Sequence, residues 1–281
     1  MQKLVRYIHS ELQGLYPETE IHSFTQLIIE KLTGFSRTEI IVNKNTLFSE
    51  KQRKEVESFI EKLKNFLPIQ YILGETEFYG LTFQVNSSVL IPRPETEELV
   101  EWIRNENDCN ANLRMLDIGT GSGCIAIILK HEFQHSEVDA FDISEEALET
   151  ARMNAELNNL TVSFSKVDIL NPPEFETKWD IIVSNPPYVL EKEKEEILPN
   201  VLDYEPHVAL FVPDNDPLLF YLKIALFAQQ HLQPNGKLYF EINRTAGRAT
   251  VDLLSGMGFS GIELRKDISG NDRMVKAVYS R

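Results

Sequence analysis

The sequence has only two cysteines, Cys109 and Cys124, among its 281 residues. They form neither a disulfide framework nor a metal-binding spacing. Basic residues are also few, because 28 Lys and Arg stand against 43 Asp and Glu, giving a formal net charge of −15. Non-specific nucleic-acid binding needs a basic surface, and the sequence contains no basic tract. We therefore expect no stable nucleic-acid partner.

The sequence also lacks any apolar run long enough to span a membrane. Its first residues include an early acidic side chain and no long apolar core, which excludes a secretory signal. A hydrophobic content of 42% is that of an ordinary globular protein with a substantial core. We expect no membrane partner, a cytoplasmic location and a monomer.

Residues 1–73 show apolar residues at helical spacing, which predicts a small bundle of helices. Ser49 is a candidate cap for a helix over 50–67. The segment contains no catalytic constellation. It either binds a partner or acts as a structural cap, and the residues alone leave both open. The apolar positions are Leu4, Ile8, Leu12, Leu15, Phe24, Leu27, Ile28, Leu32, Val56, Phe59, Ile60 and Leu63.

Residues 74–92 change to a period of two, which predicts a β-hairpin linking two parts of the chain. The stretch I-P-R-P-E-T-E follows, and its two prolines stiffen a loop. Arg93 lies between these prolines and could reach a carboxylate. Thr96 is a candidate cap for a helix that begins near Glu97.

From Leu113 onward, strands alternate with helices, which indicates a doubly wound parallel sheet of the α/β class. A closing pair of strands suggests one antiparallel strand at one side of the sheet. The charged, proline-broken segment Glu191–Asp216 is expected to form a loop over the site. The predicted strands are Arg114–Ile118, Val138–Asp142, Val162–Lys166, Trp179–Ser184, Lys237–Ile242, Gly261–Leu264 and Met274–Tyr279.

The stretch W-D-I-I-V-S-N-P-P-Y, Trp179 to Tyr188, is a buried strand that ends in a rigid polar corner. Ligands bind at the carboxyl ends of such strands. Asn185 and the Pro186 carbonyl can each accept a hydrogen bond from a planar polar group, and Tyr188 offers a flat wall. An ordinary Asn-Pro turn is the alternative reading of these residues.

The stretch L-D-I-G-T-G-S-G-C, Leu116 to Cys124, places glycines where a ligand can approach the backbone. Its spacing differs from the dinucleotide fingerprint. Asp117 beside the loop would repel a pyrophosphate and favour a cationic ligand such as S-adenosylmethionine. Asp142 ends the second strand and can accept hydrogen bonds from ribose hydroxyls, although it could instead be a helix cap. Asp168 ends the third strand and could receive an adenine amino group, or be an ordinary loop residue.

With these features together, the chain resembles class I S-adenosylmethionine-dependent methyltransferases and, more narrowly, the peptide chain release factor glutamine N5-methyltransferases. The resemblance runs from about Pro68 to the end. It rests on the motifs at Pro68–Gly74, Phe78–Val85, Val89–Glu101, Leu116–Ile127, Ser184–Tyr188, Tyr204–Leu210 and Asp267–Arg273.

The resemblance implies a seven-stranded, mostly parallel sheet and transfer of a methyl group from S-adenosyl-L-methionine to the glutamine of the Gly-Gly-Gln motif in class I peptide chain release factors. The product would be S-adenosyl-L-homocysteine. It implies an N-terminal helical substrate-recognition domain (1–73), a β-hairpin linker (74–92) and a methyltransferase domain (93–281). The expected catalytic residues are Asn185, Pro186 and Tyr188; those for substrate are Asn185, Pro186, Pro187 and Tyr188; those for cofactor are Asp117, Gly119, Thr120, Gly121, Gly123, Asp142, Ile143, Asp168, Ile169 and Asn185. We expect no metal ligands.

Two segments depart from the family pattern, Val212–Leu218 and Glu241–Gly247, which leaves the substrate loops in doubt. The stretch H-E-F-Q-H, His131 to His135, matches a zinc-protease pattern. It falls where a helix must end, so we do not expect it to bind zinc. The alternative enzyme is an N6-adenine nucleic-acid methyltransferase, against which the acidic charge argues. A non-catalytic binding module is disfavoured because Asp117, Asp142 and Asn185 are all present.

Overall fold

The computed structural model describes residues 1–280 and divides the chain into two compact units. We call Met1–Gly74 with Leu198–Tyr204 the helical unit, and Glu75–Ile197 with Glu205–Arg281 the sheet unit. The helical unit has one hydrophobic core, whereas the sheet unit has two.

The helical unit buries most of the apolar positions that the sequence predicted, among them Ile8, Leu12, Ile28 and Ile60, whereas Leu15 is 43% exposed. The predicted cap is confirmed, because the Ser49 hydroxyl accepts a hydrogen bond from the Gln52 amide at 3.2 Å. The helices are α1 (Gln2–Leu12), α2 (Glu18–Thr33), α3 (Arg37–Val42), α4 (Glu50–Lys64) and α5 (Ile69–Leu73), with α9 (Pro199–Leu202) from the later segment.

The predicted β-hairpin is present as β1 (Glu75–Phe78) and β2 (Leu81–Gln84), and its turn has Tyr79 and Gly80 at positive φ. Asn154 of α8 (Glu145–Leu157) fixes the hairpin to the sheet unit. Its Oδ1 accepts from the Gln84 amide at 2.6 Å, and its Nδ2 donates to the Gln84 carbonyl at 3.0 Å.

The sheet unit is built on a seven-stranded sheet in the order β10-β11-β9-β6-β3-β4-β5. Only β11 runs against the other strands, so the sheet is mostly parallel with one reversed strand, as predicted. The strands are β3 (Arg114–Ile118), β4 (Glu137–Asp142), β5 (Ser163–Lys166), β6 (Trp179–Ser184), β9 (Leu232–Glu241), β10 (Ser260–Lys266) and β11 (Asp272–Val278).

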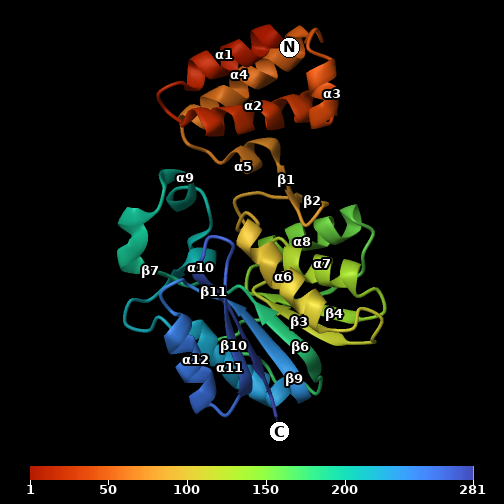
Figure 1. Ribbon diagram of the computed structural model, residues 1–281, viewed down its shortest axis with the longest axis vertical. Helices are drawn as coiled ribbons and strands as arrows, with labels where there is room; N and C mark the ends of the chain where they lie inside the picture. The colour runs from red at the N-terminus through yellow and green to blue at the C-terminus, as the bar shows by residue number, and fades with distance from the viewer. Residues whose placement is uncertain (281) are drawn as a thin grey trace. The chain divides into compact units, whose positions relative to one another are not determined.

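Both faces of this sheet are covered by helices, which explains the continuous apolar runs of its strands. Along β6, Ile181 and Val183 belong to one core, whereas Ile182 between them belongs to the other. The first core contains α6 (Pro94–Glu106), α7 (Cys124–Glu132) and α8; the second contains α11 (Leu219–His231) and α12 (Gly247–Gly256) (Figure 1). The fold is a doubly wound α/β sheet.

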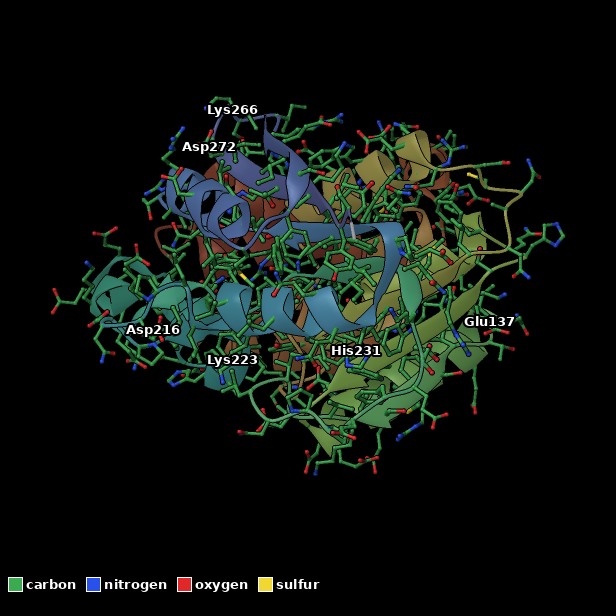
Figure 2. The ribbon with its side chains drawn as sticks, turned by 90° about the horizontal axis from the view of Figure 1, so that it is seen from below. Glu137, Asp216, Lys223, His231, Lys266 and Asp272 are labelled. Atoms are coloured by element: carbon green, nitrogen blue, oxygen red, sulfur yellow. The ribbon has the colours of Figure 1, made fainter. Side chains whose placement is uncertain are left out.

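Strand β9 begins at Leu232, earlier than the predicted Lys237, because Leu232 already pairs with Trp179. A register shift then separates this pair from the pairing of Ile181 with Lys237. The closing strands β10 and β11 form an antiparallel pair. Lys266 and Asp272 lie close together at one end of it, with 2.8 Å between Nζ and Oδ1 (Figure 2).

The segment Glu191–Asp216 is not the simple loop that we predicted. It contains a 3₁₀ helix at Glu191–Glu196, the helices α9 and α10 (His207–Leu210), and β8 (Phe211–Val212), which pairs with β7 (Val189–Leu190). Pro199 and Pro206 stand at the starts of α9 and α10, where a missing amide hydrogen costs nothing.

Within residues 1–280, no helix is both long and apolar enough to cross a membrane.

Candidate active site

A cavity of about 220 Å³ lies in the sheet unit at the carboxyl ends of β3, β4 and β6. It is the place where open α/β sheets bind ligands. Most of the predicted site residues line it, namely Gly119, Thr120, Gly121, Asp142, Ile143, Asp168, Ile169, Asn185, Pro186 and Pro187. Three predicted residues, Asp117, Gly123 and Tyr188, are not among the lining residues.

The glycine loop follows β3 and is fastened to the next strand. The amides of Gly119 and Thr120 both donate to the Phe141 carbonyl, at 2.8 and 3.0 Å. Gly119, Gly121 and Gly123 all have positive φ, where other residues would be strained. A Cβ on Gly123 would also lie 3.0 Å from the Ala151 side chain. Gly123 therefore shapes the loop by close packing from behind the cavity.

Asp142 lies in the cavity wall and is tied to the glycine loop. Its Oδ2 accepts from the Gly121 amide at 2.8 Å, and its Oδ1 accepts from the Ser144 amide at 2.9 Å. Burial raises the pKa of Asp142, whereas these backbone hydrogen bonds lower it. Ser144 itself caps α8, accepting from the Ala147 amide at 3.1 Å. Asp142 is thus not needed as the cap, and it holds the loop in place.

Asp117 is completely buried at the end of β3, behind the cavity wall. Its Oδ2 accepts a hydrogen bond of 2.6 Å from the Thr120 hydroxyl, while Oδ1 has no hydrogen-bond partner. Burial raises the pKa of this carboxyl to about 7, and the nearby charge of Asp142 adds to the effect. An unpaired buried carboxylate oxygen is costly, so it favours a cationic donor nearby. Thr120 donates this hydrogen bond and also lines the cavity, so it links the buried Asp117 carboxyl to the cavity wall.

Asp168 and Ile169 follow β5 and line the cavity. The Asp168 carboxylate organises its own turn, because Oδ1 accepts from the Leu170 amide at 2.9 Å. Ile143 is 47% exposed although it lines the cavity. Its apolar surface suits contact with a flat heterocycle better than contact with water.

The polar corner after β6 is held by a buried network that the sequence did not predict. The Thr96 hydroxyl donates to Glu241 Oε2 at 2.7 Å, and Asn185 Nδ2 donates to Thr96 Oγ1 at 3.3 Å. The Tyr188 hydroxyl donates to Glu241 Oε1 at 3.2 Å. Since Thr96 uses its only hydrogen on Glu241, it can accept only an amide N–H from Asn185. This fixes the orientation of the Asn185 amide.

Glu241 ends β9 and is 1% exposed. Burial raises the pKa of its carboxyl, and hydrogen bonds from Thr96, the charge of Arg273 and the Tyr188 hydroxyl oppose the rise. Burial likewise raises the pKa of Tyr188, helped by the Glu241 charge. Tyr188 therefore belongs to this network and does not line the cavity, contrary to the predicted flat wall.

Thr96 does not cap a helix as we predicted. Helix α6 begins at Pro94 with Arg93 at its cap position, because proline is well suited to a first helical turn. Thr96 therefore lies inside the first turn with its side chain on Glu241. The prediction that Arg93 reaches a carboxylate is confirmed, since it contacts Glu205 Oε1 at 2.5 Å.

The H-E-F-Q-H stretch is divided between a helix and a turn, because α7 ends at Glu132. His131 Nδ1 contacts its neighbour Glu132 at 3.1 Å. Among the residues that the structure describes, no group of potential metal ligands includes either histidine of this stretch.

Strand order, cavity position and acidic strand ends define the fold of a class I methyltransferase. The chain is similar in structure to a methyltransferase from Pyrococcus furiosus, with a TM-score of 0.53 and 18% sequence identity over 83% of this chain and 100% of that one. Residues 95–203 match the family model of the methyltransferase small domain, and residues 3–74 match that of the PrmC N-terminal domain.

Two relatives extend over nearly the whole chain. The release factor glutamine methyltransferase of Flavobacterium psychrophilum is 50% identical over 271 residues, covering 95% of each chain. That of Bacteroides thetaiotaomicron is 46% identical over 278 residues, covering 99% of each. The chain belongs to the release factor glutamine methyltransferase family, and the resemblance read from its motifs is confirmed.

Proposed function

We propose that this protein transfers a methyl group from S-adenosyl-L-methionine to the side-chain amide nitrogen of the glutamine in the Gly-Gly-Gln motif of class I peptide chain release factors. Near-complete coverage by relatives of that name supports the substrate. The observation that best supports the proposed reaction is the fixed orientation of the Asn185 side-chain amide in the cavity wall.

The cofactor proposal rests on the fit of the cavity to a cation. The buried Asp117 and the half-buried Asp142 lie at its glycine loop, and Asp117 Oδ1 lacks a hydrogen-bond partner. S-adenosylmethionine supplies an electrophilic methyl group on a sulfonium ion. We assign Asp142 to the ribose, Asp168 to the adenine, and the apolar contact to Ile143 and Ile169. Asp117 does not line the cavity, so we propose that it affects cofactor binding indirectly, through its hydrogen bond with Thr120 and through the position of the glycine loop.

An amide nitrogen is a weak nucleophile because its lone pair is delocalised into the carbonyl. With Nδ2 of Asn185 committed to Thr96, Oδ1 is the atom that can accept a hydrogen bond from the substrate amide. The Pro186 carbonyl can accept the other amide hydrogen. Two acceptors hold the nitrogen in one orientation, and positioning can lower a barrier by several kcal/mol. As the N–CH₃ bond forms and the S–CH₃ bond breaks, the amide proton leaves to water.

We further propose that residues 1–73 recognise the protein substrate, residues 74–92 link the parts, and residues 93–281 catalyse. The helical unit has a pocket of about 470 Å³ whose lining includes Lys3, Arg6, Lys44 and Arg53. Nearby on the same unit, Leu47 is 88% exposed. Basic and apolar surface together suit a protein partner. We propose that the reaction takes place in the cytoplasm and that the enzyme acts as a monomer.

The deciding experiment follows labelled methyl from S-adenosylmethionine into a purified release factor. We expect label in the wild-type factor, none in a factor whose Gly-Gly-Gln glutamine is replaced, and none with the Asn185→Ala enzyme. Calorimetry should show that Asn185→Ala still binds the cofactor. Label in adenine-containing nucleic acid, with none in the release factor, would instead identify the N6-adenine enzyme.

A further inference from the structure

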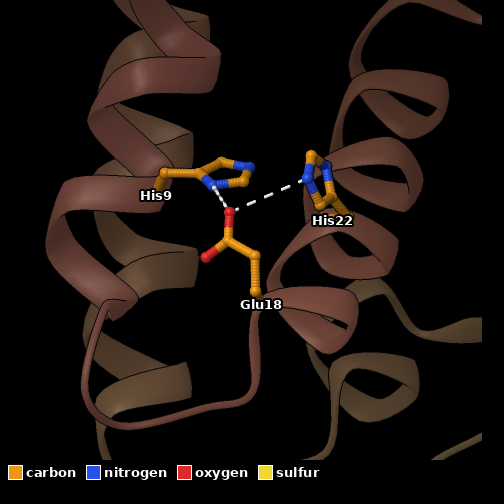
Figure 3. Close-up of side chains that lie close together, drawn as sticks. All are labelled: His9, Glu18 and His22. Carbon is orange, nitrogen blue, oxygen red and sulfur yellow. Dashed lines mark hydrogen bonds and ion pairs between the residues drawn. The ribbon is translucent and has the colours of Figure 1, made fainter.

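Two histidines and a glutamate converge on the surface of the helical unit. His9 lies on α1, whereas Glu18 and His22 lie one turn apart at the start of α2. Glu18 Oε1 is 3.1 Å from His9 Nδ1 and 3.7 Å from His22 Nε2. Figure 3 shows the carboxylate between the two imidazole rings. The three ligand atoms all lie within 4.8 Å of one another.

These separations suit a single metal ion. Zinc bonds to histidine nitrogen and carboxylate oxygen are about 2.0–2.2 Å long, so ligand atoms in a tetrahedral site lie roughly 3.3–3.5 Å apart. The two distances from Glu18 Oε1, 3.1 and 3.7 Å, lie on either side of that range. The third separation, between His9 Nδ1 and His22 Nε2, is no more than 4.8 Å, so rotation of the two exposed side chains, Glu18 and His22, is needed to bring all three atoms to one ion.

The Glu18 carboxylate gives the cluster a negative charge, which favours the binding of a cation. Among residues 1–280, the ion pairs shown for Glu18 are both to histidines. The carboxylate charge is therefore without a permanent cation.

We propose that the helical unit binds one divalent transition-metal ion of the zinc class through His9 Nδ1, Glu18 Oε1 and His22 Nε2. Two imidazoles and one carboxylate are a common zinc donor set, and three protein ligands leave a fourth position for water. The side chains of Glu18 and His22 are 65% and 68% exposed, so an ion can enter from solvent. Binding joins α1 to α2 across their connecting turn and stabilises the helical unit.

The sequence predicted no metal ligands, and the reason is local. Glu18 and His22 are four residues apart on α2, whereas His9 lies on α1. The three residues together match none of the metal-binding motifs considered in the sequence analysis. The H-E-F-Q-H stretch has the spacing of a zinc motif, but its two histidines do not share a helix face, because the helix ends at Glu132. The chain therefore contains its own matched control.

The test is a calorimetric titration of the full-length, chelator-treated protein with zinc chloride, repeated with cobalt(II) to record its visible absorption. We expect one equivalent of zinc and a tetrahedral cobalt spectrum. His22→Ala and Glu18→Gln should each weaken zinc binding by on the order of tenfold or more. His135→Ala removes a histidine outside the cluster and should leave affinity and spectrum unchanged.

Both cluster variants alter exposed side chains, and circular dichroism will show that they remain folded. No zinc binding by the wild type at micromolar concentrations would overturn the proposal. So would equal affinity in His22→Ala, or a loss of binding in His135→Ala, which would move the site to the H-E-F-Q-H stretch.

Discussion

The Thr96 hydroxyl donates a 2.7 Å hydrogen bond to Glu241, a residue 145 positions further along the chain. Both side chains are buried, with 3% and 1% exposure. The bond joins the first turn of α6 to the end of β9 and leaves Thr96 able only to accept from Asn185. A residue outside the Asn-Pro-Pro-Tyr motif thus sets the orientation of the amide within it.

Replacing Thr96 by Val should lower kcat about tenfold, or about 1.4 kcal/mol, because the Asn185 amide can then rotate. Thr96→Ser retains the hydroxyl and should restore most of the rate. Steady-state kinetics on a release factor measure kcat, and calorimetry should give the same cofactor affinity for all three proteins. Equal kcat in Thr96→Val would show that Asn185 needs no orienting partner.

Replacing Asp142 by Ala should weaken S-adenosylmethionine binding by about 1–3 kcal/mol, because it removes charged hydrogen bonds and frees the glycine loop. Glu145→Gln is the matched control, since it removes an exposed charge at the start of α8. Calorimetric titration with S-adenosylmethionine measures the cofactor affinity of both variants. Unaltered affinity in Asp142→Ala would exclude the ribose assignment.

The pKa of Asp117 predicts a specific pH dependence of stability. Burial raises it from an ordinary 3.8 to about 7, so between these values the folded state holds a proton that the unfolded chain has released. The free energy of unfolding should therefore fall as the pH rises from about 4 to about 7, by on the order of 3–4 kcal/mol. Asp117→Asn cannot ionise and should lack this fall.

Urea unfolding at several pH values measures the effect. Asp252→Asn, which alters an exposed carboxylate on α12, should keep the wild-type pH dependence. If Asp117→Asn also keeps it, the Asp117 carboxylate is ionised in the folded protein at acidic pH and must have an unseen compensating partner.

Strand positions were well predicted from the sequence, because buried parallel strands are short apolar runs with clear ends. The bounds of β3 and β6 agree with the prediction at both ends. The placement of Asp142 and Asn185 in one cavity also follows, since parallel strands end at one edge.

Contacts between distant elements could not be predicted in the same way. The Thr96–Glu241 pair depends on how α6 packs against β9, and neither residue carries a local signal for it. Thr96 reads locally as a cap because threonine before a run of glutamates is a common start of a helix. Similarly, the His9–Glu18–His22 cluster depends on how α1 packs against α2.

The basic pocket of the helical unit predicts a role in substrate capture that separates KM from kcat. Lys44→Ala combined with Arg53→Ala should raise KM for a release factor several-fold, leaving kcat and cofactor affinity unchanged, because charged residues away from the chemistry act mainly on association. The effect should shrink as salt is added. Arg37→Ala, which removes a charge of the same unit outside the pocket, is the control. A KM equal to that of the wild type at low salt would assign this pocket a structural role only.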